Sequence, residues 1–350
     1  MRLFKNNCSD PRIIRMLRST LVIIFAFVII IITSTLVIGI SIEYAKFPSL
    51  LGNQPQNVKN AQSHIDPDNF TFIVIGDVKD GTSTFESLLD IAEKENPSFI
   101  VILGDLVSHI SQTDHKLFAY EISEYAEKTP FFIIPGNHDT NPDSFSLEDF
   151  QQTYGPAQFY FTIGSYLFVF LNDLTEYNQN GEYLDYLEDV LQANSSTAKK
   201  TFVFTHIPPS GLSDLLECST FAPYSARFMD IVKKYHIDYV FTGHHHGYIK
   251  TEKDETTYIT TGGGGSKLEG SKGRFHHFVE INIEDEKISE NVVAVERKSG
   301  GSELLESNIA VCFWNPIIKN KLISAMIILA FCTAAFTALF LLKRKRISRK

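Results

Sequence analysis

The sequence FFIIPGNHD occupies residues 131–139. Four apolar residues are followed by a Pro-Gly pair and three polar residues, so the stretch predicts a short buried strand that stops near Pro135. Asn137, His138 and Asp139 then stand at the carboxyl end of that strand, which is where open α/β sheets bind their ligands. A strand that only packs has no need of such side chains there. The stretch therefore indicates a functional site.

Four other apolar runs end in the same way, each in an Asp or a His. They are residues 73–75 before Asp77, 100–103 before Asp105, 202–205 before His206, and 239–242 before His244, His245 and His246. Helical patterns fall between the runs, over residues 83–95, 115–127, 183–193 and 224–234. This alternation predicts a layered α/β fold. A hairpin pattern over 158–171 and a β-rich end over 258–295 lead us to expect two packed sheets flanked by helices.

Two long apolar runs lie near the ends of the chain, at residues 21–42 and 322–342. Each is as long as the ~20 residues that cross a bilayer. The first exceeds the ~7–15 apolar residues of a cleaved signal peptide, and a buried core helix fits poorly with so long a run at a terminus. We therefore expect an uncleaved signal anchor and a second transmembrane helix.

Basic residues flank both runs on their outer sides, in a leader over residues 1–20 and a tail over 343–350. Such residues stay in the cytoplasm, so we expect a two-pass integral membrane protein with both termini cytoplasmic. Between the spans, a polar linker over 43–69 and a domain over 70–316 would be extracytoplasmic. The chain carries a formal net charge of −9 although its ends are basic, so the middle is strongly acidic and no nucleic-acid partner is expected.

The order of the motifs at the five strand ends resembles that of the calcineurin-like metallophosphoesterases. The match rests on Gly76-Asp77, Gly104-Asp105, residues 136–139, His206 and residues 243–246, with a glycine-rich segment at 261–265. It extends over roughly residues 71–265 and loosely on to 295. The resemblance implies a four-layer α/β/β/α sandwich with a two-metal centre at the strand ends, and a hydrolase that acts on phosphoric ester bonds through a metal-activated hydroxide.

The resemblance also implies roles for individual side chains. Asp105 would bridge two divalent ions such as Mn, Fe or Zn, which take carboxylate oxygen and imidazole nitrogen. One ion would have Asn137, His206 and His244 as further ligands, and the other would have Asp77 and His246. His138 would bind no metal and would stabilise or protonate the leaving oxygen. His245 would point away from the ligands on either side of it.

The sequence departs from the family pattern at two positions. Lys79 stands where the family has a ligating histidine, and an ammonium has no lone pair to offer. We therefore predict one tightly held metal and a second that is weak or absent, with Lys79 facing the substrate phosphate. There are two alternatives: Lys79 pairs with Asp80, or His109 replaces the missing ligand. Ser108 stands where the family often has an aspartate that orients the catalytic histidine.

The sequence thus predicts a membrane-anchored, metal-dependent phosphoesterase. Its substrate would be a phosphorylated small molecule or a lipid-linked phosphate, cleaved as a monoester, a diester or a pyrophosphate. The second hypothesis is a degenerate domain that binds a ligand without turnover, and the two departures motivate it.

Overall fold

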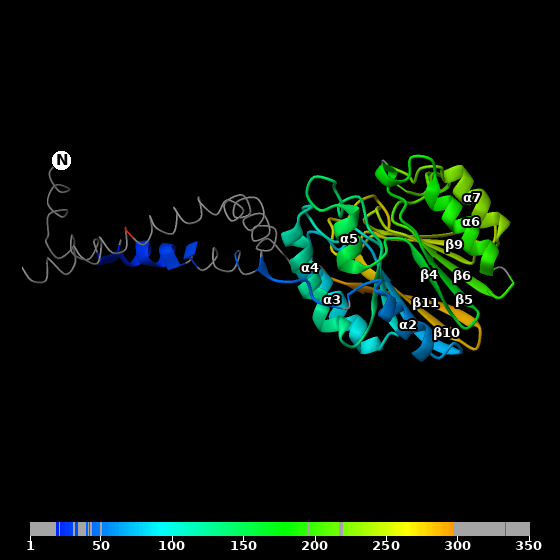
Figure 1. Cartoon of the computed structure of the whole chain (residues 1–350), viewed down its shortest axis with the longest axis horizontal. Helices are drawn as coiled ribbons and strands as arrows, with labels where there is room; N and C mark the ends of the chain where they lie inside the picture. The colour runs from blue at the N-terminus through cyan, green and yellow to red at the C-terminus, as the bar shows by residue number, and fades with distance from the viewer. Residues whose placement is uncertain are drawn as a thin grey trace, which may run out of the picture. The chain divides into compact units, whose positions relative to one another are not determined.

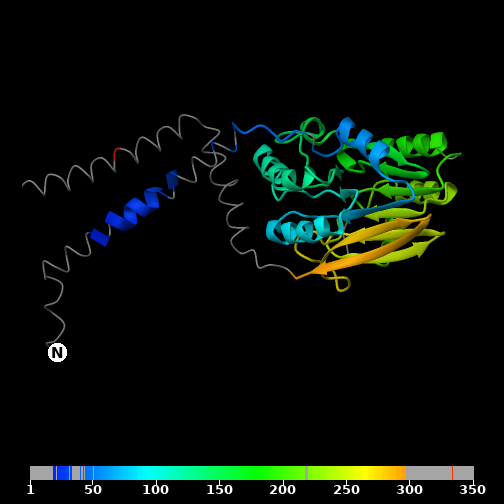
Figure 2. The same ribbon diagram turned by 90° about the horizontal axis from the view of Figure 1, so that it is seen from below.

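The computed structural model describes residues 51–194, 196–216 and 220–296, together with residues 19–20, 22–30, 32–33, 40, 42, 44–49 and 333. The chain divides into two compact units, of which one spans residues 46–306 and the other contains the two ends. The sheets and helices described below belong to the larger unit (Figures 1 and 2).

The two expected membrane helices fall largely on residues outside this description. Residues 22–30 are helical, but the run at 21–42 is described only in part, and that at 322–342 only at Thr333. Among the described residues, no helix combines the length and the apolar character needed to cross a bilayer.

The first sheet has the strand order β11-β10-β1-β2-β3. Strands β1, β2 and β3 are parallel, whereas β10 and β11 are antiparallel additions beside β1. The bounds are β1 Asn69–Ile75, β2 Phe99–Ile102, β3 Phe131–Ile133, β10 His276–Glu284 and β11 Lys287–Val295.

The second sheet has the order β4-β5-β6-β7-β9-β8. Its central strands β5, β6, β7 and β9 are parallel, and a hairpin joins β4 to β5 as the sequence predicts. The bounds are β4 Phe159–Ile163, β5 Tyr166–Phe170, β6 Lys200–Phe204, β7 Tyr239–Thr242, β8 Tyr248–Lys253 and β9 Thr256–Thr261.

Apolar side chains from both sheets form the central core. Successive residues of a strand face opposite sides, so Phe72 and Val74 of β1 point to the second sheet while Ile73 and Ile75 point to the helices. Phe72 stacks on Phe99 with ring centroids 5.0 Å apart and meets Phe168 of the second sheet edge-on at 5.6 Å. Aromatic packing therefore fixes the two sheets face to face.

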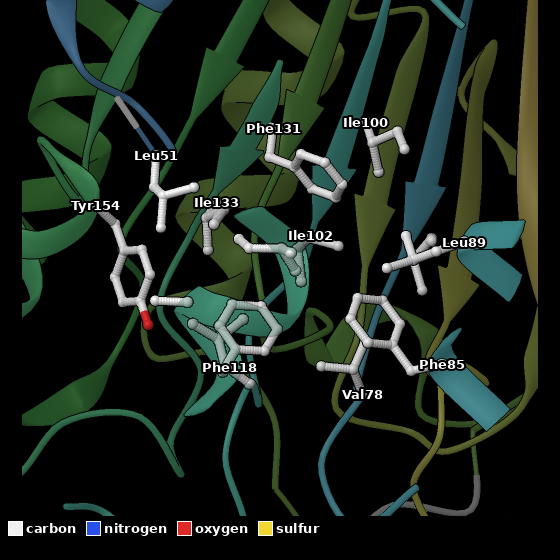
Figure 3. Close-up of a cluster of buried hydrophobic side chains, with 14 of the residues drawn as sticks. Leu51, Val78, Phe85, Leu89, Ile100, Ile102, Phe118, Phe131, Ile133 and Tyr154 are labelled. Atoms are coloured by element: carbon white, nitrogen blue, oxygen red, sulfur yellow. The ribbon is translucent and has the colours of Figure 1, made fainter. Parts of the chain in front are cut away.

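Helices cover the outer face of each sheet. Figure 3 shows the first of these layers, where Phe85, Leu89 and Phe118 of the helices meet Ile100 and Ile102 of β2. Helices α6 and α7 cover the second sheet in the same way. The helix bounds are α3 Thr82–Ala92, α4 Gln112–Ala126, α5 Leu147–Tyr154, α6 Glu182–Asn194 and α7 Ser225–Lys234, with 3₁₀ turns at Glu93–Glu95, Thr175–Tyr177 and Ser210–Leu212. The predicted four-layer order of helices, sheet, sheet and helices is thus observed.

The segment over residues 43–69, expected to be a linker, contains a helix in its second half. Helix α2 spans Pro55–His64 there, with a proline in the first turn, where its missing N–H costs nothing. The Asn53 side chain is buried and bonds both the N–H and the C=O of Ile133 in β3, at 2.7 and 2.5 Å. The helix buries only Ala61, so its sequence lacks the apolar stripe that would have revealed it.

Candidate metal centre

The strand ends converge as the sequence predicts. Because β1, β2 and β3 are parallel, the loops that follow them leave the first sheet at one edge, and the loops after β6 and β7 do the same in the second. Ligand atoms of Asp77, Asp105 and His206 lie within 4.8 Å of one another, and all three residues are buried. Three segments far apart in sequence thus supply one cluster.

The backbone at these positions is unusual. Asp77, Asp105 and His244 have φ of 57°, 54° and 65°, in the left-handed region that residues other than glycine rarely adopt. Gly104 precedes Asp105 with φ of 83°, and a Cβ there would stand 2.4 Å from the backbone nitrogen of Gly136. The loops after β2 and β3 therefore pack backbone against backbone. Strain of this kind gathers at functional sites, where the surrounding structure maintains it.

His206 presents a lone pair to the cluster. Its Nδ1 donates a hydrogen bond to the carbonyl of Leu103 at 2.7 Å, so the neutral ring carries no hydrogen on Nε2. That Nε2 faces Asn137 Oδ1 at 3.0 Å and Asp105 Oδ1 at 3.5 Å. Burial lowers the pKa of His206, but the neighbouring Asp105 and Asp77 carboxylates raise it more, so the net shift is upward. On the neutral ring, Nε2 offers a lone pair that a cation could share with the two oxygens, whereas a protonated ring would donate a hydrogen bond to them.

His244 completes this half of the centre. Its Nδ1 lies 3.0 Å from the same Asn137 oxygen, and its backbone N–H donates to Asp77 Oδ2 at 2.9 Å. Burial and the nearby His206 lower the pKa of His244 to about 4. The ring is therefore neutral at physiological pH, the state in which imidazole binds metals.

Asp77 and His246 form the other half. His246 Nδ1 donates to the carbonyl of Lys267 at 2.9 Å, which leaves Nε2 facing Asp77 Oδ1 at 3.4 Å. That carboxylate oxygen is buried and makes no hydrogen bond among the described residues. All six predicted ligands thus lie together, although their roles stay predictions.

Lys79 pairs with Asp105 and not with its neighbour Asp80, which was the alternative partner. Its Nζ lies 2.6 Å from Asp105 Oδ2, and its side chain is 8% exposed. Burial raises the pKa of Asp105, but His206 and Lys79 lower it more, and the result is well below the usual range. Asp105 is therefore a firmly ionised carboxylate with one oxygen on an ammonium.

The histidines outside the ligand set occupy distinct places. The backbone N–H of His138 donates to Asp105 Oδ1 at 3.0 Å, and its half-buried ring has a pKa lowered by burial. His109 Nδ1 lies 3.3 Å from Asp114 Oδ2 at the start of α4, so the ring faces that carboxylate. His245 is buried.

Two buried aspartates support the centre, and the sequence assigned a role to neither. Asp139 accepts the backbone N–H groups of Leu106 and Gly136, both at 2.7 Å, and so ties the loops after β2 and β3 together. Asp173 follows β5 and accepts the N–H of Ile207 at 2.8 Å, next to His206. The signal for Asp173 was present, since it follows the apolar run 166–171 as Asp77 follows β1.

The donor set fits a divalent transition metal. Carboxylate oxygens, an amide oxygen and imidazole nitrogens suit Mn, Fe and Zn, and the buried Asp77 Oδ1, which makes no hydrogen bond among the described residues, is an acceptor that a cation would satisfy. Two ring tautomers are fixed by backbone carbonyls, which is how protein ligands are oriented toward a metal.

Comparison with known proteins also indicates a phosphoesterase. The family model described as calcineurin-like phosphoesterase matches residues 70–248. Serine/threonine-protein phosphatase CPPED1 of Bos taurus is 27% identical over an alignment of 156 residues, which covers 38% of this chain and 50% of the relative. Purple acid phosphatase 23 of Arabidopsis thaliana is 21% identical over 230 residues, 53% of this chain and 50% of the relative.

The chain therefore spans about half the length of the curated relatives it matches. Among solved structures, a dimetal phosphatase from Danio rerio aligns with a TM-score of 0.50 and 15% identity, over 67% of this chain and 100% of the other. At that identity the likeness concerns the fold.

Proposed function

The chain belongs to the calcineurin-like phosphoesterase family, and we propose that it hydrolyses a phosphoric ester with a divalent metal at the centre described above. One observation carries the proposal. Ligand atoms of the buried Asp77, Asp105 and His206 lie within 4.8 Å of one another, and Asp77 Oδ1 makes no hydrogen bond among the described residues. Such an arrangement is costly in a protein that binds no cation.

The chain's own residues then supply positioning and proton donation. A divalent ion such as Mn, Fe or Zn would polarise the phosphoryl group and acidify a water molecule. Leu103 and Lys267 hold His206 and His246 in the required tautomers through their carbonyls. His138 is tied to Asp105 by its backbone and donates a hydrogen bond or a proton to the leaving oxygen.

We further propose that the domain acts next to a membrane. The apolar runs at 21–42 and 322–342 and the basic residues outside them support two anchors, cytoplasmic termini and an extracytoplasmic domain. The substrate class is a phosphate monoester, a diester or a pyrophosphate, and lipid-linked phosphates are included because the anchors would hold the site close to a bilayer.

A second candidate function is a binding module that takes a phosphorylated ligand without turnover. The contact between Lys79 and Asp105 favours it, because an ammonium occupies an oxygen that a second metal would need.

A pair of variants separates these functions. Purified full-length protein is assayed for hydrolysis of an aryl phosphate and an aryl phosphodiester, and its metal content is measured by mass spectrometry. His138→Ala should lower turnover by roughly 10²–10⁴-fold, the usual worth of general acid catalysis, with its metal retained. Asp105→Ala should lose both turnover and metal, and the exposed His64→Ala should change neither.

The assignment fails if His138→Ala loses the metal or Asp105→Ala keeps it. A metal-loaded wild type that hydrolyses neither substrate would support the binding module.

A further inference from the structure

We propose that Lys79 is a built-in second cation, so that the centre holds a single divalent ion in place of two. The inference rests on the proposed metal-dependent function and concerns how that centre is charged. It is based on the Asp105 carboxylate, whose two oxygens contact different kinds of partner.

The two oxygens of Asp105 face different groups. Oδ1 lies toward the metal ligands, 3.5 Å from His206 Nε2, and accepts the N–H of His138 at 3.0 Å. Oδ2 is held by Lys79 Nζ at 2.6 Å. A carboxylate that bridges two ions through both of its oxygens gives one oxygen to each, and here the second oxygen already has the ammonium of Lys79 on it.

Lys79 is fixed in this place by its backbone as well as by its charge. Its N–H donates to the carbonyl of Asp105 at 3.0 Å, and its own carbonyl accepts the hydroxyl of Ser266 at 3.2 Å. The side chain is only 8% exposed. If the ammonium moved away, it would leave a buried and uncompensated carboxylate, which is a strongly unfavourable state.

The remaining ligand atoms suit one ion. Asp77, Asp105 and His206 each place one ligand atom within 4.8 Å of the others. An ion on the side of Asp77 and His246 would have these two residues of its own and could share Asp105 only through Oδ1, because Lys79 occupies Oδ2. Two ligands of its own are fewer than the three protein ligands typical of a catalytic metal.

The charge of the site also favours a single divalent ion. One divalent ion and the ammonium place three positive charges against the two carboxylates of Asp77 and Asp105, and the negative charge of a phosphate ester would offset the excess. A second divalent ion would raise the positive charge to five at distances where repulsion is strong in a buried site. Lys79 can supply part of what a second ion would supply, since an ammonium also neutralises a phosphoryl oxygen and donates hydrogen bonds to it.

The test is the metal stoichiometry, which needs no substrate. Full-length protein is loaded with Mn²⁺, dialysed and measured by mass spectrometry, and electron paramagnetic resonance reports whether two ions are coupled. The wild type should hold about one ion with an uncoupled signal. Lys79→Gln, which keeps a donor but removes the charge, should bind a second ion at least 10-fold more tightly than the wild type. Lys79→His should approach two ions with a coupled signal.

Lys200→His is the matched control. Lys200 stands at the start of β6, away from the centre, and its ammonium also lies 2.6 Å from an aspartate, Asp238. It should behave as the wild type. Two tightly held, coupled ions in the wild type would overturn the inference, and so would a stoichiometry that stays at one in both Lys79 variants. Hydrolysis by a two-ion wild type would leave the proposed function standing, whereas one bound ion without hydrolysis would refute that function and leave this inference intact.

Discussion

At the level of single residues, the sequence identifies the side chains of the centre but not the bonds that set their chemical state. Asp77, Asp105, Asn137, His206, His244 and His246 were singled out by their place after apolar runs, and the family resemblance implied that they bind metal. The carbonyls of Leu103 and Lys267, which fix two histidine tautomers, carry no sequence signal because every residue has one.

The partner of Lys79 was likewise not predictable from the sequence. The sequence offered its neighbour Asp80 as a partner, whereas the structure pairs it with Asp105, 26 residues later. The reason is that the chain after β1 runs beside the loop after β2, where the N–H of Lys79 bonds the carbonyl of Asp105. Such a pairing follows from the fold alone.

A buried histidine outside the centre makes acid stability testable. His115 is fully buried, stacks on Phe145 with ring centroids 3.8 Å apart, and bonds the carbonyl of Asp139 through Nε2 at 2.8 Å. Burial lowers the pKa of His115 to about 3, and the Asp139 carbonyl and the Asp149 carboxylate offset only part of this effect. The ring is therefore neutral in the folded protein.

Because the pKa of His115 is lower in the folded state than the ~6.5 of an unfolded chain, its contribution is full above pH ~6.5 and is lost as pH falls toward 3. At pH 4.5 the loss is about 3 kcal/mol of unfolding free energy, at about 1.4 kcal/mol per pH unit. Urea unfolding at pH 7 and pH 4.5 should show a smaller loss in His115→Gln than in the wild type. The exposed His64→Gln should lose as much as the wild type, and an equal loss in all three proteins would contradict the argument.

At the level of elements, apolar runs and helical spacing predict most of the domain. The expected helices at 83–95, 115–127, 183–193 and 224–234 correspond to α3 with its 3₁₀ turn, α4, α6 and α7, with ends that differ by a few residues. Helices α2 and α5 were missed because both are short and mostly polar. Helix α5 instead begins with a reciprocal pair of bonds between Ser146 and Asp149, a cap that the sequence contains but that is a weak signal by itself.

The position of the site was predictable for a physical reason, whereas the order of the strands was not. Parallel strands share an edge, so polar residues after several apolar runs must gather there. By contrast, β10 and β11 come late in the chain and join the first sheet beside β1. Their long-range pairing is decided by packing of both faces, which a single sequence does not display.

At the level of the whole molecule, the proposed anchors set where the reaction takes place. Protease added to sealed vesicles of known orientation should reach the domain from the extracytoplasmic side and leave the tail at 343–350 intact, since basic residues keep that tail in the cytoplasm. Detergent should expose both. A tail that is cleaved while the domain is protected would reverse the topology.

The central claim is that a divalent metal at the strand ends performs phosphoester hydrolysis. The most direct measurement follows hydrolysis of an aryl phosphate and an aryl phosphodiester by one preparation of full-length protein, first as purified, then after removal of metal by a chelator, and then after Mn²⁺, Fe²⁺ or Zn²⁺ is restored. We predict that turnover of at least one substrate falls to background on chelation and returns with a restored ion, while thermal unfolding shows that the metal-free protein stays folded. Turnover that survives complete metal removal, or that is absent at every stage from a folded and metal-loaded protein, would contradict the account.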